Sequence, residues 1–424
     1  MSTFTPAFQL STGVQSYEWG KIGSDSKAAQ FGKTTKGFKI EEGKPYAELW
    51  MGTHPSCPSS RAETSELLSK IIASDPKAYL GPKVQERFGD DLPFLFKVLA
   101  IGKALSIQAH PNKQLAEQLH KDRPDVYKDD NHKPEMAIAI TPFKAFVGFR
   151  PLAEIASFLS VVPEFSDLIS SQAKTTFIAC AGQTSLPLSH DPSKVALREV
   201  FESLMTADEA EVKTQLAKLV NRYEVGGVEV NEEVETKELR ELVRSLNEQF
   251  PDDIGVFCSF LLNVVSLEPG GGAFLKADEP HAYISGDIVE CMATSDNVVR
   301  AGLTPKLRDV PTLVSMLTYY SAPPDAQLMN PDQFKSLAHT KLYDPPIDEF
   351  SVAHTHLPSG EKEKQPAVDG PSILLITEGT GKLICGEVES ELETGAVWFI
   401  AAGQELELSA NGALQAYRAF VEAN

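Results

Sequence analysis

The sequence predicts an α+β protein, mainly β, in which an all-helical segment is inserted into the β portion. Short apolar runs separated by turn residues fill residues 1–150 and return after about residue 263. Between them, residues 151–262 carry apolar side chains at helical spacing. A chain of 424 residues, at ~150 per domain, suggests two or three domains.

Residues 1–150 are expected to form the first part of a β domain. The runs 94–100 and 145–149 are short, aromatic and β-branched, which is typical of strands. Helices are expected near 63–73 and 113–121, so this part is mixed.

Residues 151–262 are expected to form the helical insertion. Apolar residues recur at 197, 201 and 204 and again at 239, 242, 243, 246 and 250, interleaved with charged residues. Thr206 and Glu209 have the spacing of a capping box, and the glycine pair 226–227 is expected to end a helix.

Residues 263–335 are expected to complete the first β domain, with a strand at 287–292. Residues 336–424 alternate apolar runs with tight turns, at 372–377, 382–385 and 396–400, and are expected to form a smaller all-β domain. His354 and His356 in this part are expected to be solvated strand residues.

The net charge of −20 argues against a protein that coats nucleic acid or an anionic membrane surface. No apolar run reaches the ~18 residues of a membrane-spanning helix, and no secretory signal is recognisable at the start, so we expect a cytoplasmic protein. The cysteines are odd in number and scattered, and we expect buried free thiols at Cys57, Cys180, Cys258, Cys291 and Cys385.

Four scattered residues have the chemistry of a metal site. On a strand, Gln108 and His110 project to the same face. Glu135 precedes the apolar run 136–140, where a buried carboxylate needs a partner or a metal. His281 follows the glycine-rich turn 270–272, as in a jelly-roll barrel that points an imidazole inward. Together they form a Zn²⁺ set with a vacancy, although each alone is also compatible with a structural role.

A second group could move protons and bind anions. Glu290 lies among apolar residues that would raise its pKa toward the range useful for proton transfer. Arg300 projects from an apolar segment, and Lys306 follows a Thr-Pro turn. An internal ion pair between Glu290 and Arg300 is the alternative interpretation.

Six strings resemble those of the type I mannose-6-phosphate isomerase family, and they occur in that family's order. They are YEWG at 17–20, AELWMGTH at 47–54, SIQAHP at 106–111, NHKPE at 131–135, DEPHAY at 278–283 and SDNVVRAG at 295–302. The resemblance covers essentially the whole chain, including the helical insertion.

This resemblance implies a cupin-type jelly-roll enzyme with one Zn²⁺ per chain. It would interconvert mannose 6-phosphate and fructose 6-phosphate and feed the synthesis of GDP-mannose for glycosylation. We expect a monomer whose partner is this sugar phosphate, with no nucleic acid or membrane partner. By motif, the zinc ligands would be Gln108, His110, Glu135 and His281.

The resemblance also assigns the residues around the substrate. Arg300 matches the family's active-site arginine. Positions near the sugar phosphate are matched by Lys97, Ser106, Lys133 and Lys306. Residues that line the same cavity are matched by Trp19, Glu48, Tyr283 and Glu290.

Moving a carbonyl from C1 to C2 needs a base that carries a proton between the two carbons, and a positive charge that stabilises the enediol-like intermediate. Glu290 is the first candidate for the base, and Lys133 or His132 is the rival. Arg300 has two candidate roles, polarising the reacting oxygen or holding the phosphate.

Two other classes of function remain compatible with such a site. Cupin barrels also hold non-haem iron oxygenases, which use two histidines and a carboxylate. The barrel could instead be a sugar-binding module with a structural metal. Glu290 beside Arg300 favours an isomerase, because a binding module needs no acid-base group next to an open metal.

Overall fold

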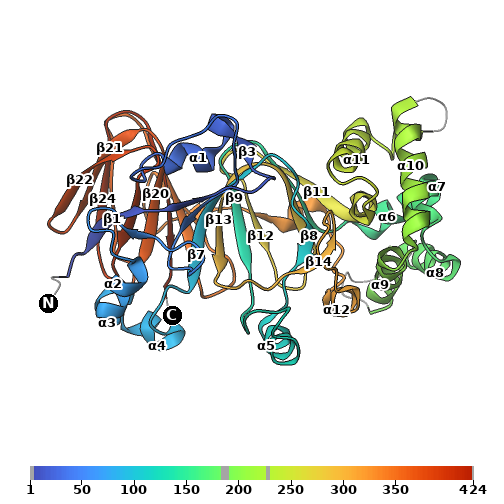
Figure 1. The fold of residues 1–424 in the computed structure, drawn as a ribbon, viewed down its shortest axis with the longest axis horizontal. Coiled ribbons are helices and arrows are strands. Elements are labelled where there is room, and N and C mark those ends of the chain that lie inside the picture. The colour runs from blue at the N-terminus through green and yellow to red at the C-terminus, as the bar shows by residue number, and fades with distance from the viewer. Residues whose placement is uncertain (1–3, 183–190, 226–229, 423–424) are drawn as a thin grey trace.

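The computed structural model describes residues 4–182, 191–225 and 230–422. Figure 1 shows an elongated molecule: a β unit formed mainly by the C-terminal strands lies at one end, a second β unit lies in the middle and a group of helices forms the other end. The predicted fold class, α+β and mainly β with a helical insertion, is confirmed.

The middle unit is built on an eleven-stranded antiparallel arrangement. Its strands are β2 (Gly13–Gln15), β5 (Glu48–Met51), β7 (Phe94–Ile101), β8 (Ile107–Ala109), β9 (Glu135–Ala139), β10 (Phe143–Phe149), β11 (Leu262–Leu267), β12 (Gly272–Leu275), β13 (His281–Ala293), β14 (Val299–Gly302) and β15 (Leu328–Met329). The long strand β13 pairs with β7, β8, β9 and β10. Strands β7 and β9 are buried at every position and are apolar except for Lys97 and Glu135, whereas β13 is buried except at Ser285 and also carries His281, Asp287 and Glu290.

The helices interrupt this β unit in sequence but not in space. They are α6 (Leu152–Val161), α7 (Pro163–Ser166), α8 (Ser171–Ala181), α9 (Asp191–Met205), α10 (Glu209–Val225), α11 (Lys237–Gln249) and the 3₁₀ helix η2 (Ile254–Phe260). Strand β10, before the helices, pairs with β11, directly after them. The helices therefore form an insertion between two neighbouring strands.

One predicted helix cap is wrong and another prediction lies outside the described residues. Helix α10 begins at Glu209, and the carboxylate of Asp208 accepts from the backbone N–H of Ala210 at 3.0 Å. Thr206 therefore does not form the expected capping box with Glu209, because the nearer aspartate satisfies the free N–H groups. The glycine pair 226–227 lies outside the described part of the chain.

The other β unit is a sandwich of two antiparallel sheets. The larger sheet contains β16 (Asp332–Gln333), β17 (Thr340–Tyr343), β18 (Ser351–Leu357), β25 (Leu414–Phe420), β20 (Ser372–Glu378), β23 (Val397–Ile400), β1 (Ala7–Ser11) and β6 (Ser60–Arg61). The smaller sheet contains β19 (Lys362–Gln365), β24 (Leu406–Ala410), β21 (Thr380–Cys385) and β22 (Val388–Glu393). An apolar core lies between them.

Strand β1 joins this sheet although it belongs to the first residues of the chain. It pairs antiparallel with β23, nearly 400 residues later, so that Ala7 lies opposite Ile400. The domain boundary predicted at residue 150 places β1 with the middle unit and not with the sheet that it joins. A pattern along the sequence contains no information about pairing between such distant strands.

Short elements complete the structure: α1 (Lys27–Gly32), α2 (Leu68–Ser74), α3 (Pro76–Leu80), α4 (Pro82–Phe88), α5 (Lys113–Asp122), α12 (Val310–Met316), η1 (Gly23–Asp25), η3 (Pro324–Gln327), β3 (Lys21–Ile22) and β4 (Pro45–Tyr46). The helix expected at 113–121 is confirmed, and the one expected at 63–73 begins only at Leu68. Among the described helices, none has the length and apolar character needed to cross a membrane.

The predictions about isolated side chains are confirmed in part. All five cysteines are free thiols, as expected, but Cys258, Cys291 and Cys385 are buried whereas Cys57 and Cys180 are partly exposed. His356 is exposed, but His354 is not a solvated residue, because its ring stacks on that of Tyr417 with the centroids 4.2 Å apart. Burial lowers the pKa of His354 to about 4.

Candidate active site

A buried group of two imidazoles and one carboxylate forms the chemical centre of the middle unit. It consists of His110, just after β8, Glu135 at the start of β9, and His281 at the start of β13, with 0%, 2% and 1% of their surfaces exposed. One donor atom from each lies within 4.8 Å of the others. The Nε2 atoms of both histidines lie 3.3 Å from the Glu135 carboxylate.

Backbone carbonyls orient both imidazoles toward the carboxylate. Nδ1 of His110 lies 2.6 Å from the carbonyl oxygen of Asn297, and Nδ1 of His281 lies 3.2 Å from that of Glu279. Because a carbonyl only accepts, each Nδ1 carries the proton and donates it, and each Nε2 presents a lone pair. This is the arrangement by which outer hydrogen bonds fix metal-binding histidines.

The atoms that face each other in this group have no hydrogen-bond partner. They are Nε2 of His110, Nε2 of His281 and Oε2 of Glu135, all buried. Burial lowers the pKa of His110 to about 4, which favours the neutral ligand form. Burial alone would raise the pKa of Glu135, but His110 and the Lys133 ammonium hold it well below its usual range. A cation satisfies all three atoms at once, and this donor set fits one Zn²⁺ ion.

Three adjacent strands align Gln108 and Arg300 with this group. In the antiparallel register, Gln108 lies opposite His281 on one side and opposite Arg300 on the other. Side chains opposite each other in a sheet project from the same face. Gln108 is therefore a neighbour of both the histidine and the arginine, and Ser106 donates to its Oε1 at 3.4 Å.

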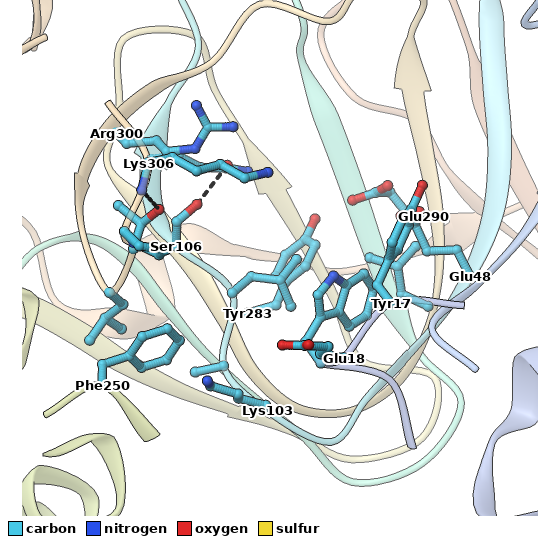
Figure 2. A pocket seen from close by; sticks show the side chains of 18 of the residues that line it. Tyr17, Glu18, Glu48, Lys103, Ser106, Phe250, Tyr283, Glu290, Arg300 and Lys306 are labelled. Carbon is cyan, nitrogen blue, oxygen red and sulfur yellow. Dashed lines mark hydrogen bonds between the residues drawn. The ribbon is translucent and has the colours of Figure 1, made fainter. Parts of the chain in front are cut away.

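A pocket of about 440 Å³ reaches the group at Glu135, whereas His110 and His281 are not among the residues that line it. It brings together the predicted residues Trp19, Glu48, Lys97, Ser106, Gln108, Lys133, Glu135, Tyr283, Glu290, Arg300 and Lys306. These residues come from segments almost 300 positions apart, so their convergence does not follow from any local pattern. Figure 2 shows Arg300, Lys306 and Ser106 on one side, Glu290 and Glu48 on the other, and Tyr283 between them.

The acidic side is organised around a buried lysine. Nζ of Lys97 lies 3.5 Å from Oε2 of Glu290 and 3.7 Å from Oε1 of Glu48. Lys97 and Glu290 lie opposite each other on β7 and β13. Burial raises the pKa of Glu290, and the negative charge of Glu135 raises it further, whereas Lys97 opposes both. Glu290 is thus a buried carboxylate beside the metal group, and the ammonium groups of Lys97 and Lys133 stabilise its ionised form.

The opposite side offers positive charge with no protein partner. Within the described ranges, the guanidinium of Arg300 makes no hydrogen bond or ion pair. Lys306 is exposed on the loop that follows β14, and its Nζ forms no ion pair with any described residue. Such groups are free to bind an anionic ligand in the pocket.

His132 and Lys133 are neighbours in sequence but face different surroundings. Lys133 lines the pocket, and its Nζ lies 3.2 Å from Oε1 of Glu135. The Nε2 of His132 instead contacts the carboxylate of Glu349, and His132 is not among the residues that line the pocket. Of these two candidate bases, only Lys133 is placed within reach of a ligand.

Sequence reasoning missed several residues of the pocket wall. Tyr17 and Glu18 flank Trp19, and the rings of Tyr17 and Trp19 stack with their centroids 6.0 Å apart. Both stand in the string YEWG, whose other members could have been considered. Lys103 and Phe250 carry no such signal, because Phe250 comes from the end of the helical insertion and meets Lys103 only in the folded chain.

The fold and the site together define a metal-dependent enzyme built on antiparallel β-sheets, with a carboxylate and unpaired cations around one pocket. Models of three domains of type I phosphomannose isomerase match the chain: the catalytic domain at 7–152, the helical insertion domain at 168–262 and the C-terminal domain at 341–387. The chain belongs to the type I phosphomannose isomerase family. The prediction of an enzyme of this family is confirmed.

Named relatives extend over the whole chain. The mannose-6-phosphate isomerase of Cryptococcus neoformans is 50% identical, covering 98% of this chain and 99% of its own length. That of Saccharomyces cerevisiae is 46% identical, with 98% and 99% covered. A crystal structure of mannose 6-phosphate isomerase bound with zinc and yttrium has a TM-score of 0.82 at 32% identity, covering 99% of this chain and 100% of the other. A substituted variant of phosphomannose isomerase from Salmonella typhimurium gives a TM-score of 0.83 with the same identity and coverage.

Proposed function

We propose that this protein is a zinc-dependent aldose-ketose isomerase that interconverts mannose 6-phosphate and fructose 6-phosphate. The observation that carries the proposal is the buried His110, Glu135 and His281 group, which meets, at Glu135, a pocket with an acid on one side and cations that pair with no described residue on the other. Membership of the type I phosphomannose isomerase family supports the same substrate pair.

We assign the zinc ligands to Gln108, His110, Glu135 and His281. When bound, Zn²⁺ supplies a positive charge that stabilises negative charge on the reacting oxygens of the sugar. The protein's part is to hold the two imidazoles in the tautomer that presents Nε2, through the carbonyls of Asn297 and Glu279. The side-chain oxygen of Gln108 would complete the set from the neighbouring strand.

The phosphate is assigned to Ser106 and Lys306, and Arg300 on the same side of the pocket is assigned to the negative charge that develops on the reacting oxygen. A cation that pairs with no described residue and a hydroxyl suit a dianion, and they fix one end of a flexible open-chain sugar. Trp19 and Tyr283 would line the sugar, and Lys133 would face its reacting end beside Glu135. An overall charge of −20 is compatible with this anion because the positive charge is local.

Glu290 is the proposed base. It would take the proton from C2 of the aldose and return it to C1, through an enediol-like intermediate. Its burial keeps the carboxylate basic, and Lys97 at 3.5 Å keeps a fraction of it ionised. The orientation of His132 toward Glu349 argues against this histidine as the carrier.

A coupled assay that follows mannose 6-phosphate to fructose 6-phosphate tests the reaction. We expect activity to disappear on complete chelation and to return with Zn²⁺, with one zinc per chain by elemental analysis. Activity that survives complete metal removal contradicts the zinc mechanism. Iron in the purified protein, with oxygen consumption and no isomerase activity, would instead indicate an oxygenase.

Exchange of the substrate C2 proton with solvent deuterium tests the base. We expect Glu290→Gln to abolish the exchange while zinc content stays at one per chain. Lys133→Ala is the matched comparison, because Lys133 lines the same pocket and pairs with a zinc ligand. Full exchange in Glu290→Gln together with loss in Lys133→Ala would move the role to Lys133.

We further propose the wider setting that follows from this activity. The product mannose 6-phosphate would feed GDP-mannose synthesis and glycosylation in the cytoplasm, and the enzyme would act as a monomer. We assign residues 1–150 and 263–335 to the catalytic domain, 151–262 to the helical insertion and 336–424 to the C-terminal domain. Expression of 151–262 alone as a folded unit would support this division.

A further inference from the structure

The segment that leaves the helical insertion, residues 249–255, contacts two walls of the pocket. On one wall, Oε1 of Gln249 accepts from the backbone N–H of Ala104 at 2.7 Å. Nζ of Lys103 lies 4.5 Å from the ring centroid of Phe250, which itself lines the pocket. The insertion is therefore part of the site and not only a neighbour of it.

On the other wall, the carboxylate of Asp253 binds the loop after β14. Its Oδ1 accepts from the backbone N–H of Gly255 and of Leu303, both at 2.7 Å. Its Oδ2 accepts from the backbone N–H of Thr304 at 3.0 Å. One carboxylate thus joins two segments about 50 residues apart through two charge-assisted hydrogen bonds, to Leu303 and Thr304, while the third bond is local to Gly255.

The backbone of this loop is in a conformation that needs support. Leu303 has a φ of 53°, in the left-handed region that is unfavourable for a branched apolar residue. The two segments also approach so closely that a Cβ on Gly302 would lie 2.5 Å from Cα of Gly255. The Asp253 hydrogen bonds and this close contact hold the loop against the insertion.

The two unpaired cations are held by different means. Arg300 lies within β14, where it pairs in register with Gln108 of β8. Lys306 lies beyond β14, and its own backbone N–H donates to Oγ1 of Thr304 at 3.1 Å. The position of Lys306 therefore depends on Thr304, which Asp253 holds, whereas the position of Arg300 depends on the sheet.

We propose that Asp253 is a positioning residue through which the helical insertion places Lys306 for the substrate phosphate. This inference rests on the proposed function, since it assigns Lys306 to the phosphate. Removal of the carboxylate releases the loop and weakens binding of the 6-phosphate. The proton-transfer side, with Glu290 and Lys97 on β13 and β7, keeps its geometry.

The first test is the pair Asp253→Ala and Asp208→Ala. Asp208 also accepts backbone N–H bonds in the insertion, at 3.0 Å from Ala210, but it does not line the pocket. We expect Asp253→Ala to raise KM for mannose 6-phosphate about tenfold with kcat changed less than about twofold. Asp208→Ala should leave both constants unchanged. Equal zinc content and circular dichroism spectra establish that the variants are folded.

A second variant and a binding probe keep the test independent of folding and of turnover. Asp253→Asn retains the Oδ1 acceptor and loses the one that serves Thr304, so we expect a smaller rise in KM than in Asp253→Ala. Calorimetric titration with glucitol 6-phosphate, which has no carbonyl to isomerise, measures phosphate-side binding directly. Its Kd should rise about tenfold in Asp253→Ala.

A double-variant cycle with Lys306→Ala separates positioning from general destabilisation. If Asp253 acts through Lys306, Asp253→Ala has little further effect on the Kd of glucitol 6-phosphate once Lys306 is removed. Equal effects in both backgrounds, or an unchanged Kd in Asp253→Ala, would overturn the inference. Failure of the unsubstituted protein to isomerise mannose 6-phosphate would refute the proposed function alone, because the titration does not require turnover.

Discussion

Replacement of Lys97 by methionine removes the ammonium group that forms an ion pair with the proposed base, Glu290. Nζ of Lys97 lies 3.5 Å from Glu290 and 3.7 Å from Glu48, and 4.6 Å from the ring centroid of Trp50. Methionine has a similar length and keeps apolar contact with the tryptophan, so Lys97→Met changes mainly the charge. Both carboxylates are then buried without their partner.

The expected size follows from the distance between the charges. With an effective dielectric constant of about 20, two unit charges 3.5 Å apart interact by about 4 to 5 kcal/mol. At 1.36 kcal/mol per pKa unit, this sets a ceiling of about three units on the rise in the pKa of Glu290. Reorganisation and water entry reduce it, so we expect a rise of about one to two units.

The assay is the pH dependence of kcat/KM. A base accepts a proton only when it is ionised, so a higher pKa of Glu290 lowers the active fraction at pH 7. The acid limb of the profile should therefore move about one to two units toward higher pH in Lys97→Met, with activity recovering on the alkaline side. Adding Glu48→Gln removes a neighbouring negative charge that also raises the pKa of Glu290, and should move the limb part of the way back.

An acid limb that stays in place would refute the reasoning. The conclusion holds if Lys97→Met is folded and contains one zinc per chain, since loss of a buried partner can cost about 3 to 5 kcal/mol of stability. If the acid limb moves in Lys97→Met but does not move back when Glu48→Gln is added, the charge of Glu48 does not contribute to the pKa of Glu290.

Three further outcomes are expected. Arg300→Ala should lower kcat about 100-fold or more with little change in KM, because a charge used in the transition state acts there; a variant with normal kcat and raised KM would contradict this. Asp129 accepts a hydrogen bond from the side chain of Asn297, and the backbone carbonyl of Asn297 orients His110. Asp129→Ala should therefore weaken Zn²⁺ binding about tenfold in a chelator competition. An unchanged Zn²⁺ affinity would show that Asp129 does not help to position His110. The pKa of His354 is near 6.5 in the unfolded chain and about 4 in the folded protein. The contribution of neutral His354 to the free energy of unfolding is therefore fully present above pH 6.5, and up to about 3 kcal/mol of it is lost as the pH falls toward 4. The free energy of unfolding, measured with urea at pH 7.5 and 4.5, should therefore differ less between the two pH values in His354→Phe than in the unsubstituted protein.

The sequence determined the parts of this protein that local stereochemistry controls. Strand alternation predicted that Gln108 and His110 share one face; Gln108 lies on β8 and His110 directly follows this strand. The apolar run after Glu135 marked a buried strand. Helical spacing predicted a helical insertion over residues 151–262, the model of the family's helical insertion domain matches residues 168–262, and the motifs indicated the family. These features depend on neighbours a few positions away, so one sequence suffices to recognise them.

Only the tertiary structure decided which of these residues meet. The register of β13 against β7 places Glu290 opposite Lys97, and the turn of the His132 ring toward Glu349 removes it from the pocket wall. Phe250 and Asp253 reach the site from the helical insertion. Contacts of this kind join segments far apart in sequence, and they are set by the packing of whole sheets and helices. A local pattern contains no record of them, because the chain between two such segments can take many paths.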